Sequence, residues 1–134
     1  MTEQPYISEI QVRVRYAETD AMGIVHHAQY IVYFEEGRSS YARERGSAYS
    51  DIERSGYYLT VTGVNVRYMH PARYDELLLL RTWVTEMKSR GITFAYEILN
   101  AESGERLVTG STNHICITHE GKVAKIPEAW RGWG

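Results

Sequence analysis

The stretch that decides the fold is YAETDAMGIVHHAQYIVYFEEGRSSY, residues 16 to 41. A strand-like pattern ends where it begins, Asp20 follows alone, Gly23 permits a turn, and two adjacent histidines precede a change of period. From Tyr30 the apolar side chains recur at steps of four and three residues, as they do on one face of a helix. The stretch therefore predicts a turn that carries a carboxylate and leads into a long helix.

The predicted helix has one apolar stripe, made of Tyr30, Phe34, Gly37 and Tyr41. It should end near Gly46, because glycine is the preferred residue just beyond the last turn of a helix. Gly37 inside the helix costs about 1 kcal/mol relative to alanine. Close approach of the helix to a sheet is one reason for a glycine at this position.

Strand patterns lie on both sides of this helix. Before it, one face of an alternating pattern is formed by Ile10, Val12, Val14 and Tyr16. After an irregular piece at residues 47–60, four further strand-like runs are TGVNVRYMH, ELLLLRTWVTEM, GITFAYEIL and RLVTGSTNHICITH. Short turns between these runs favour antiparallel neighbours. The order predicts an α+β architecture with one helix against one antiparallel sheet, and the uncovered apolar surface favours pairing with a second copy.

Composition narrows the function further. The 134 residues fit a single domain, 1–134, and 43% of them are hydrophobic. The net charge is −2 with no block of like charges, which disfavours nucleic-acid binding and a polybasic membrane patch, and no run is apolar enough for membrane insertion. The single cysteine, Cys116, excludes an intrachain disulfide and fits a small buried residue in a reducing compartment. We expect a cytoplasmic protein.

Asp20 admits several interpretations. It could be an ordinary loop residue, or a helix cap, although a cap fits poorly because the helical period begins several residues later. A metal site with His26 and His27 also fits poorly, because adjacent histidines point in different directions and the other histidines are isolated. No Gly-x-Ser-x-Gly motif or glycine-rich phosphate loop is present in the sequence.

A catalytic carboxylate beside the amino end of a helix remains. Free N–H groups at a helix start stabilise a carbonyl oxygen as it becomes an oxyanion. Asp20 could then attack the carbonyl or deprotonate a water molecule. A thioester suits this arrangement, because a thiolate leaves without much help from an acid.

The same stretch resembles the signature of the hotdog-fold acyl-CoA thioesterases, in the 4-hydroxybenzoyl-CoA thioesterase branch with its Tol-Pal-associated relatives. The matching positions are Tyr16, Thr19, Asp20, Gly23, Ile24, Val25, His27, Tyr30, Glu35 and Arg38. The resemblance continues in PARYDELLLLRTWV and GSTNHICITHEGKVAKIPE, so it covers nearly the whole chain. It implies a five-stranded antiparallel sheet wrapped around a helix at 28–45, with two protomers joined edge to edge, active sites between them, and dimers that commonly pair into a homotetramer.

The resemblance also implies roles for particular residues. Asp20 matches the catalytic carboxylate, and His27 matches the residue whose backbone N–H faces the thioester oxygen. Gly23 would let the loop approach the acyl group, and Tyr30 would line the acyl channel or pack beneath it. The remaining substrate-contacting positions of the signature are Val25 and His26. Relatives often have Tyr or Trp at position 26, and Asp in place of Glu18.

Coenzyme A ends in phosphates, so basic residues are expected at the mouth of the pocket. The turn in MKSRGITF offers Lys88 and Arg90, and further candidates are Arg67 and Arg73. We therefore expect an acyl-CoA thioesterase that needs no metal and no bound cofactor, since coenzyme A is part of the substrate. The alternatives are a hotdog acyl-thioester dehydratase or hydratase, and a non-catalytic acyl-thioester binding protein. Short aliphatic, long aliphatic and aromatic acyl groups all remain open.

Overall fold

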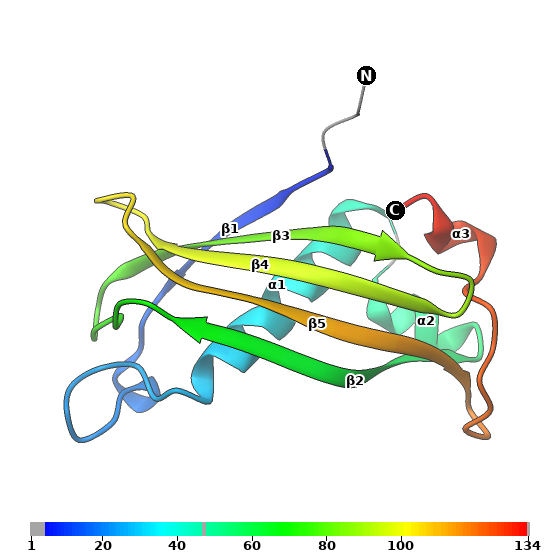
Figure 1. The fold of residues 1–134 in the computed structure, drawn as a ribbon, viewed down its shortest axis with the longest axis horizontal. Helices are drawn as coiled ribbons and strands as arrows, with labels where there is room; N and C mark the ends of the chain where they lie inside the picture. The colour runs from blue at the N-terminus through cyan, green and yellow to red at the C-terminus, as the bar shows by residue number, and fades with distance from the viewer. Residues whose placement is uncertain (1–4, 47, 134) are drawn as a thin grey trace.

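A computed structural model describes residues 5–46 and 48–133. Five strands form one antiparallel sheet in the order β1-β3-β4-β5-β2, and α1 lies across one face of it (Figure 1). The elements along the chain are β1 (Ser8–Arg13), the 3-10 turn η1 (Tyr16–Glu18), α1 (Gln29–Glu44), α2 (Tyr49–Arg54), β2 (Tyr57–Tyr68), β3 (Leu77–Met87), β4 (Gly91–Asn100), β5 (Arg106–Thr118) and α3 (Glu128–Arg131).

Helix α1 buries the predicted stripe against the sheet. Tyr30, Phe34 and Tyr41 are each at most 3% exposed, and the Phe34 ring stacks on Tyr96 of β4 at 4.2 Å. Gly37 lies against Thr82 of β3, so closely that a Cβ on this glycine would collide with the threonine hydroxyl. The predicted close approach is therefore confirmed, and it explains why the helix accepts a residue with poor helical propensity.

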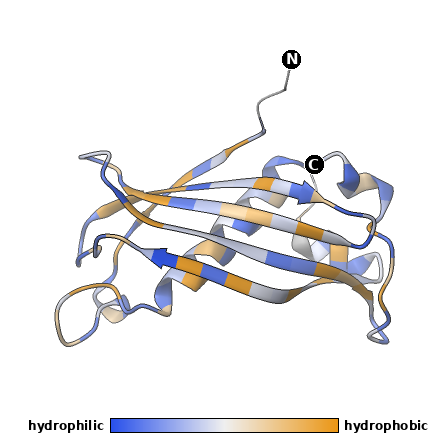
Figure 2. Cartoon of the chain, viewed as in Figure 1, coloured by the Kyte–Doolittle hydropathy of each residue, from blue (hydrophilic) through white to orange (hydrophobic). Residues whose placement is uncertain are grey.

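The two central strands alternate as their sequences predict. From Leu78 to Val84 in β3 and from Ile92 to Ile98 in β4, every second residue is buried against α1, and the residues between them are only partly buried. The buried set of β4 is the predicted one: Ile92, Phe94, Tyr96 and Ile98. Bands of high and low hydropathy alternate along the strands in the same way (Figure 2). The hydrophobic core thus lies between α1 and one face of the sheet.

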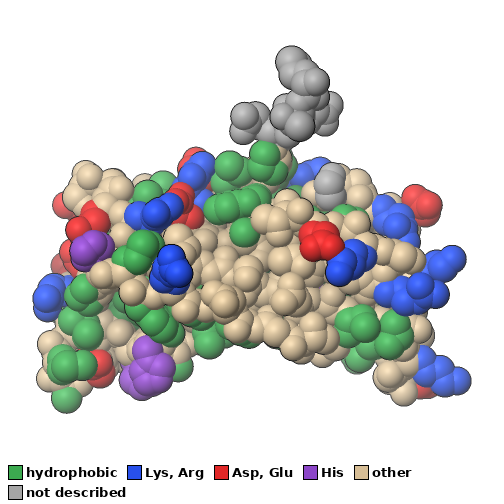
Figure 3. Space-filling model, in the orientation of Figure 1, with side chains coloured by type: hydrophobic (Ala, Val, Ile, Leu, Met, Phe, Trp, Pro, Cys, Tyr) green, Lys and Arg blue, Asp and Glu red, His purple; other side chains and the backbone are tan. Residues whose placement is uncertain are grey.

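Strand β2 forms an edge of the sheet and is less covered than the centre. Val64 pairs with Thr112, which is buried beneath α1, yet Val64 itself is 44% exposed. Apolar side chains with similar exposure occur along the whole strand, namely Tyr58, Val61 and Tyr68. The outer face of the sheet, in contrast, shows few charged or hydrophobic side chains at its centre (Figure 3). The β2 edge therefore carries a row of exposed apolar side chains.

The structure differs from the sequence prediction in two places. Residues 49–54 form α2, and β2 begins at Tyr57, although residues 47–60 were predicted to be irregular. A six-residue helix is too short to show a period, and Ile52 is its only fully buried residue among those whose side chains are described. The first strand ends at Arg13, so Tyr16 lies in η1 and is 77% exposed instead of facing the core.

Candidate active site

The loop that precedes α1 forms a tight hairpin that carries Asp20. Thr19 and Val25 form a bridge at its ends, and the Asp20 N–H donates to the Ile24 carbonyl oxygen at 2.8 Å. The N–H of Gly23 donates to the Asp20 carbonyl oxygen at 3.0 Å. Gly23 has a φ of 80°, which glycine adopts at little cost. The predicted turn is present, and it fixes the backbone at Asp20.

The side chain of Asp20 is only partly occupied by the fold. Its Oδ1 accepts a hydrogen bond from the Met22 N–H at 2.8 Å, which orients the carboxylate within the hairpin. Within residues 5–46 and 48–133, no group donates a hydrogen bond to its Oδ2. Asp20 is half-buried, so this oxygen is available to a bound molecule.

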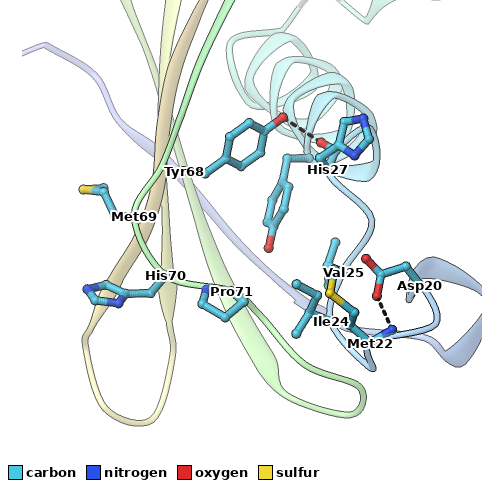
Figure 4. Close-up of a pocket in the computed structure, with 10 residues that line it drawn as sticks. Asp20, Met22, Ile24, Val25, His27, Tyr68, Met69, His70 and Pro71 are labelled. Atoms are coloured by element: carbon cyan, nitrogen blue, oxygen red, sulfur yellow. Dashed lines mark hydrogen bonds between the residues drawn. The ribbon is translucent and has the colours of Figure 1, made fainter.

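Asp20 borders a cavity of about 320 Å³ between the hairpin, the start of α1 and the end of β2. The carboxylate comes from one side of this cavity, and residues after β2 close the other side (Figure 4). Its lining residues are Asp20, Met22, Ile24, Val25, His27, Tyr30, Tyr68, Met69, His70 and Pro71. Most of these side chains are apolar or aromatic, so the cavity suits an apolar group held beside one carboxylate.

His27, which lies two residues before α1, is among the residues that line this cavity. His26 accepts two hydrogen bonds here. Its backbone carbonyl accepts one from the Gln29 N–H at 2.9 Å, and its ring Nδ1 accepts one from the Ala28 N–H at 3.2 Å. The carbonyl of His27 accepts the Tyr68 hydroxyl at 2.8 Å. In the described part of the chain, however, no group accepts a hydrogen bond from the His27 N–H. This donor lies just before a sixteen-residue helix, whose dipole favours negative charge at that point.

Tyr30 both lines the cavity and packs in the core. Its ring is 3% exposed and meets Tyr33 and Tyr68 edge-on at 6.0 and 5.6 Å. Its hydroxyl accepts the N–H of Ala72 at 3.1 Å, and burial raises its pKa. Tyr30 therefore packs in the core and borders the cavity at the same time.

Three of the predicted substrate contacts, His26, Lys88 and Arg90, do not line the cavity beside Asp20. His26 is exposed, and its ring stacks on that of His27 at 4.3 Å, but it does not line the cavity. Lys88 and Arg90 line a separate cavity of about 430 Å³ at the β3–β4 turn. One chain by itself does not bring these two cations to Asp20. Arg73 is closer, because its backbone forms a bridge with Ile24 of the hairpin.

Two parts of the site were not predicted from the sequence. One is the wall formed by Tyr68 and the three residues after it, which the strand pattern of β2 did not mark. The other is Glu18, which is 7% exposed and accepts the Tyr33 hydroxyl at 2.8 Å. Its only signal in the sequence was the difference from the aspartate common in relatives.

Residues 5–46 and 48–133 contain neither a cluster of metal-ligating side chains nor a membrane-spanning helix. No three His, Cys, Asp or Glu side chains are grouped as metal ligands would be. No helix in this part of the chain is both long and apolar enough to cross a membrane.

Comparison with known proteins now identifies the class. The sequence profile of the thioesterase-like superfamily matches residues 14–134, and the chain belongs to this family. The predicted hotdog fold is confirmed, and so is the predicted class of enzyme, a thioester hydrolase.

Three similar proteins show how far the likeness extends. A candidate acyl-CoA thioesterase of Bacillus subtilis, YneP, is 35% identical over 129 residues, which cover 96% of this chain and 93% of that protein. The acyl-CoA thioester hydrolase YbgC of Escherichia coli is 34% identical over 92 residues, or 69% of each chain. The crystal structure of a DHNA-CoA thioesterase from Staphylococcus aureus superposes with a TM-score of 0.88 at 36% identity, covering 95% of this chain and 85% of that one.

Proposed function

We propose that this protein hydrolyses acyl-CoA thioesters to a free carboxylic acid and coenzyme A, with Asp20 and the His27 N–H acting on the thioester carbonyl. One observation carries this proposal: Asp20 and His27 border the same apolar cavity, and among the described residues nothing bonds to Oδ2 of Asp20 or to the N–H of His27. The names of the similar acyl-CoA and DHNA-CoA thioesterases support the same substrate class.

The reaction follows from the two groups. The acyl chain occupies the apolar cavity, and the carbonyl oxygen accepts the His27 N–H, which stabilises the negative charge that develops there. Asp20 either removes a proton from water as the hydroxide attacks, or attacks the carbonyl itself to form an anhydride that water then cleaves. Both routes break the C–S bond, release the thiolate of coenzyme A and leave the acyl group as a carboxylate.

A homodimer would complete the site. Two β2 strands paired antiparallel about a two-fold axis place the Tyr68 end of one strand beside the Tyr57 end of the other. The cavity lies at the Tyr68 end, and the β3–β4 turn with Lys88 and Arg90 lies toward the Tyr57 end. The second copy's cations would therefore approach the mouth of the cavity, where the phosphates of coenzyme A would lie.

This pairing would also cover the exposed apolar side chains of β2, and such dimers could associate further into a tetramer. We propose that the reaction takes place in the cytoplasm, which agrees with a single buried, free cysteine. Light scattering of the purified protein measures the oligomeric state directly.

Replacement of Asp20 by asparagine tests the proposal. The amide oxygen of Asp20→Asn still accepts the Met22 N–H, so the hairpin should keep its shape while the base or nucleophile is lost. We expect kcat for thiol release to fall by about 10²- to 10⁴-fold. The substrates should include short and long aliphatic acyl-CoA, benzoyl-CoA and phenylacetyl-CoA.

Asp51→Asn is the matched control, because Asp51 is an exposed carboxylate on α2 outside the cavity. It should retain wild-type turnover. Wild-type turnover in Asp20→Asn would remove Asp20 from the mechanism. An enoyl-CoA hydration assay run in parallel distinguishes hydrolysis from hydratase chemistry on the same fold.

A further inference from the structure

Glu18 is a buried carboxylate that the proposed chemistry does not use. It is 7% exposed, and among the described residues no other Asp or Glu is buried to this degree. Its Oε1 accepts the Arg15 N–H at 2.9 Å and the Tyr33 hydroxyl at 2.8 Å. Its Oε2 accepts Nε of Arg15 at 3.1 Å and Nε2 of Gln29 at 3.3 Å.

These hydrogen bonds join two segments on either side of the hairpin. Arg15 belongs to the segment that leads into the hairpin, whereas Gln29 and Tyr33 belong to the first turns of α1. The Glu18 backbone adds a further connection, because its carbonyl accepts the His26 N–H at 2.9 Å. Side chain and backbone together hold the start of α1 against the segment between β1 and Asp20.

The charge on Glu18 is kept in place by its partners. Burial alone would raise the pKa of Glu18, but the hydrogen bonds from the Arg15 N–H, the Tyr33 hydroxyl and the Arg15 side chain outweigh it and lower the pKa. The Arg15 guanidinium lies 3.0 Å from Oε2. A buried, ionised carboxylate is weak evidence for stability, because an apolar side chain of similar volume often stabilises as well. The buried charge of Glu18 is better explained by the fixed geometry that its hydrogen bonds impose between the segment before the hairpin and the start of α1.

We propose that Glu18 is a positioning residue, which holds the His27 amide at the start of α1 in the correct place relative to the Asp20 carboxylate. The proposal rests on the proposed function, since it assumes that these two groups act on one carbonyl. Glu18 lies two residues before Asp20; its backbone carbonyl accepts the N–H of His26, just before His27, and its side chain accepts Nε2 of Gln29, two residues after His27. Displacement of one group by about 1 Å can cost as much as 10² in rate.

The test compares Glu18→Gln with Glu44→Gln. Glu44 is the matched control, because it is an acidic residue at the other end of α1 that also accepts three side-chain hydrogen bonds, from Tyr6, Ser8 and Ser40. In Glu18→Gln the side-chain amide would face the donors of Arg15 and Gln29. We expect kcat to fall by about tenfold or more with KM within about twofold, because a positioning defect appears mainly in the transition state.

Two further variants identify the mechanism. Glu18→Asp keeps the charge and should recover part of kcat. Tyr33→Phe, which removes only the hydrogen bond from the Tyr33 hydroxyl to Glu18, should reproduce part of the loss. If Glu18 acts through Tyr33, the loss in the double variant should be smaller than the product of the two single losses. Should Glu18→Gln fail to fold, Tyr33→Phe carries the test alone through the same split between kcat and KM.

The outcomes separate this proposal from the proposed function. Loss of activity in Asp20→Asn together with a wild-type kcat in Glu18→Gln, or in Tyr33→Phe if that variant stands alone, would overturn the role of Glu18 only. Equal losses of kcat in Glu18→Gln and Glu44→Gln would also overturn it, because both would then follow general stability. An active Asp20→Asn would instead overturn the proposed function.

Discussion

The two ends of α1 are built in opposite ways. At the amino end, the His27 N–H has no acceptor among the described residues and the helix start opens onto a cavity. At the carboxyl end, the Arg45 N–H donates to the Tyr41 carbonyl at 3.0 Å, and Gly46, with a φ of 86°, donates its N–H to Arg43 at 3.1 Å. One end borders a cavity, and the other is covered by the chain itself.

The side chains around the carboxyl end make the same contrast. The Tyr41 hydroxyl donates to the Trp133 carbonyl at 3.1 Å, and the two rings meet edge-on at 5.7 Å. Arg45 donates to the Gly132 carbonyl at 3.0 Å. Residues near the C-terminus therefore cover this end of the helix (Figure 1). The carboxyl end of α1 is thus held by hydrogen bonds and ring contacts that support stability, whereas the amino end borders a cavity beside a carboxylate.

The largest effect should come from the closed end, and it should be on stability alone. Trp133 is 5% exposed and packs on Tyr41 and Phe94. We expect Trp133→Ala to lower the free energy of unfolding by about 3 to 5 kcal/mol, because it leaves a cavity in the core. Urea denaturation measures this loss. At a temperature where the variant stays folded, kcat should match the wild type, and a selective loss of kcat would show that this end also serves catalysis.

A change at the amino end of α1 should lower activity and leave stability almost unchanged. His27→Pro removes the N–H that would stabilise the oxyanion, at a position near a helix start where proline is tolerated. We expect kcat to fall by about 10²- to 10³-fold with little change in Tm. His27→Ala is the control, because it removes the imidazole but keeps the amide, and it should stay within about fivefold of the wild type. Equal activity of the two variants would exclude the amide as the oxyanion donor.

The middle of α1 offers a smaller, pH-dependent effect. Arg38 donates to the Tyr96 hydroxyl at 3.2 Å, and Thr112 connects this hydroxyl to Nε2 of His114. Burial and the nearby guanidinium of Arg38 lower the pKa of His114 from 6.5 to about 4.

The unfolded chain therefore binds this proton at a higher pH than the folded chain. The contribution of His114 to stability is complete above pH 6.5 and is lost as the pH falls toward 4, by up to about 3 kcal/mol. Urea denaturation between pH 7 and 4 should show a steeper loss for the wild type than for His114→Gln. Parallel curves would mean that the buried imidazole titrates normally.

The sequence was informative wherever the signal was local. The stripe of α1 and the alternation of β4 each lie within one element, so a period reveals them. Asp20, Gly23, Val25 and His27 lie within eight residues, so a short signature could place them together. The same holds for Gly37, whose cost in a helix pointed to the close contact with the sheet.

What the sequence did not reveal depends on tertiary contacts. Tyr68 reaches the cavity only because β2 ends beside the start of α1. The hydrophobic periodicity of the sequence does not indicate this contact between two elements. The role proposed for Glu18 depends on a hydrogen bond from Tyr33, fifteen residues later, which forms only in the folded chain. Lys88 and Arg90 were predicted from charge, which does not say which cavity a cation borders.

The contact between Gly37 and Thr82 has a consequence for how this enzyme can diverge. Because no side chain separates helix from sheet there, α1 lies at its closest possible distance from β3 at this point, and a larger residue at position 37 would push the two apart. Room for a longer or wider acyl group has to come from the walls that do not support the core. Met22, 73% exposed, and Met69 beyond the end of β2 form such walls. Adaptation to new acyl groups is thus directed to flexible, replaceable side chains, while the catalytic framework stays constant.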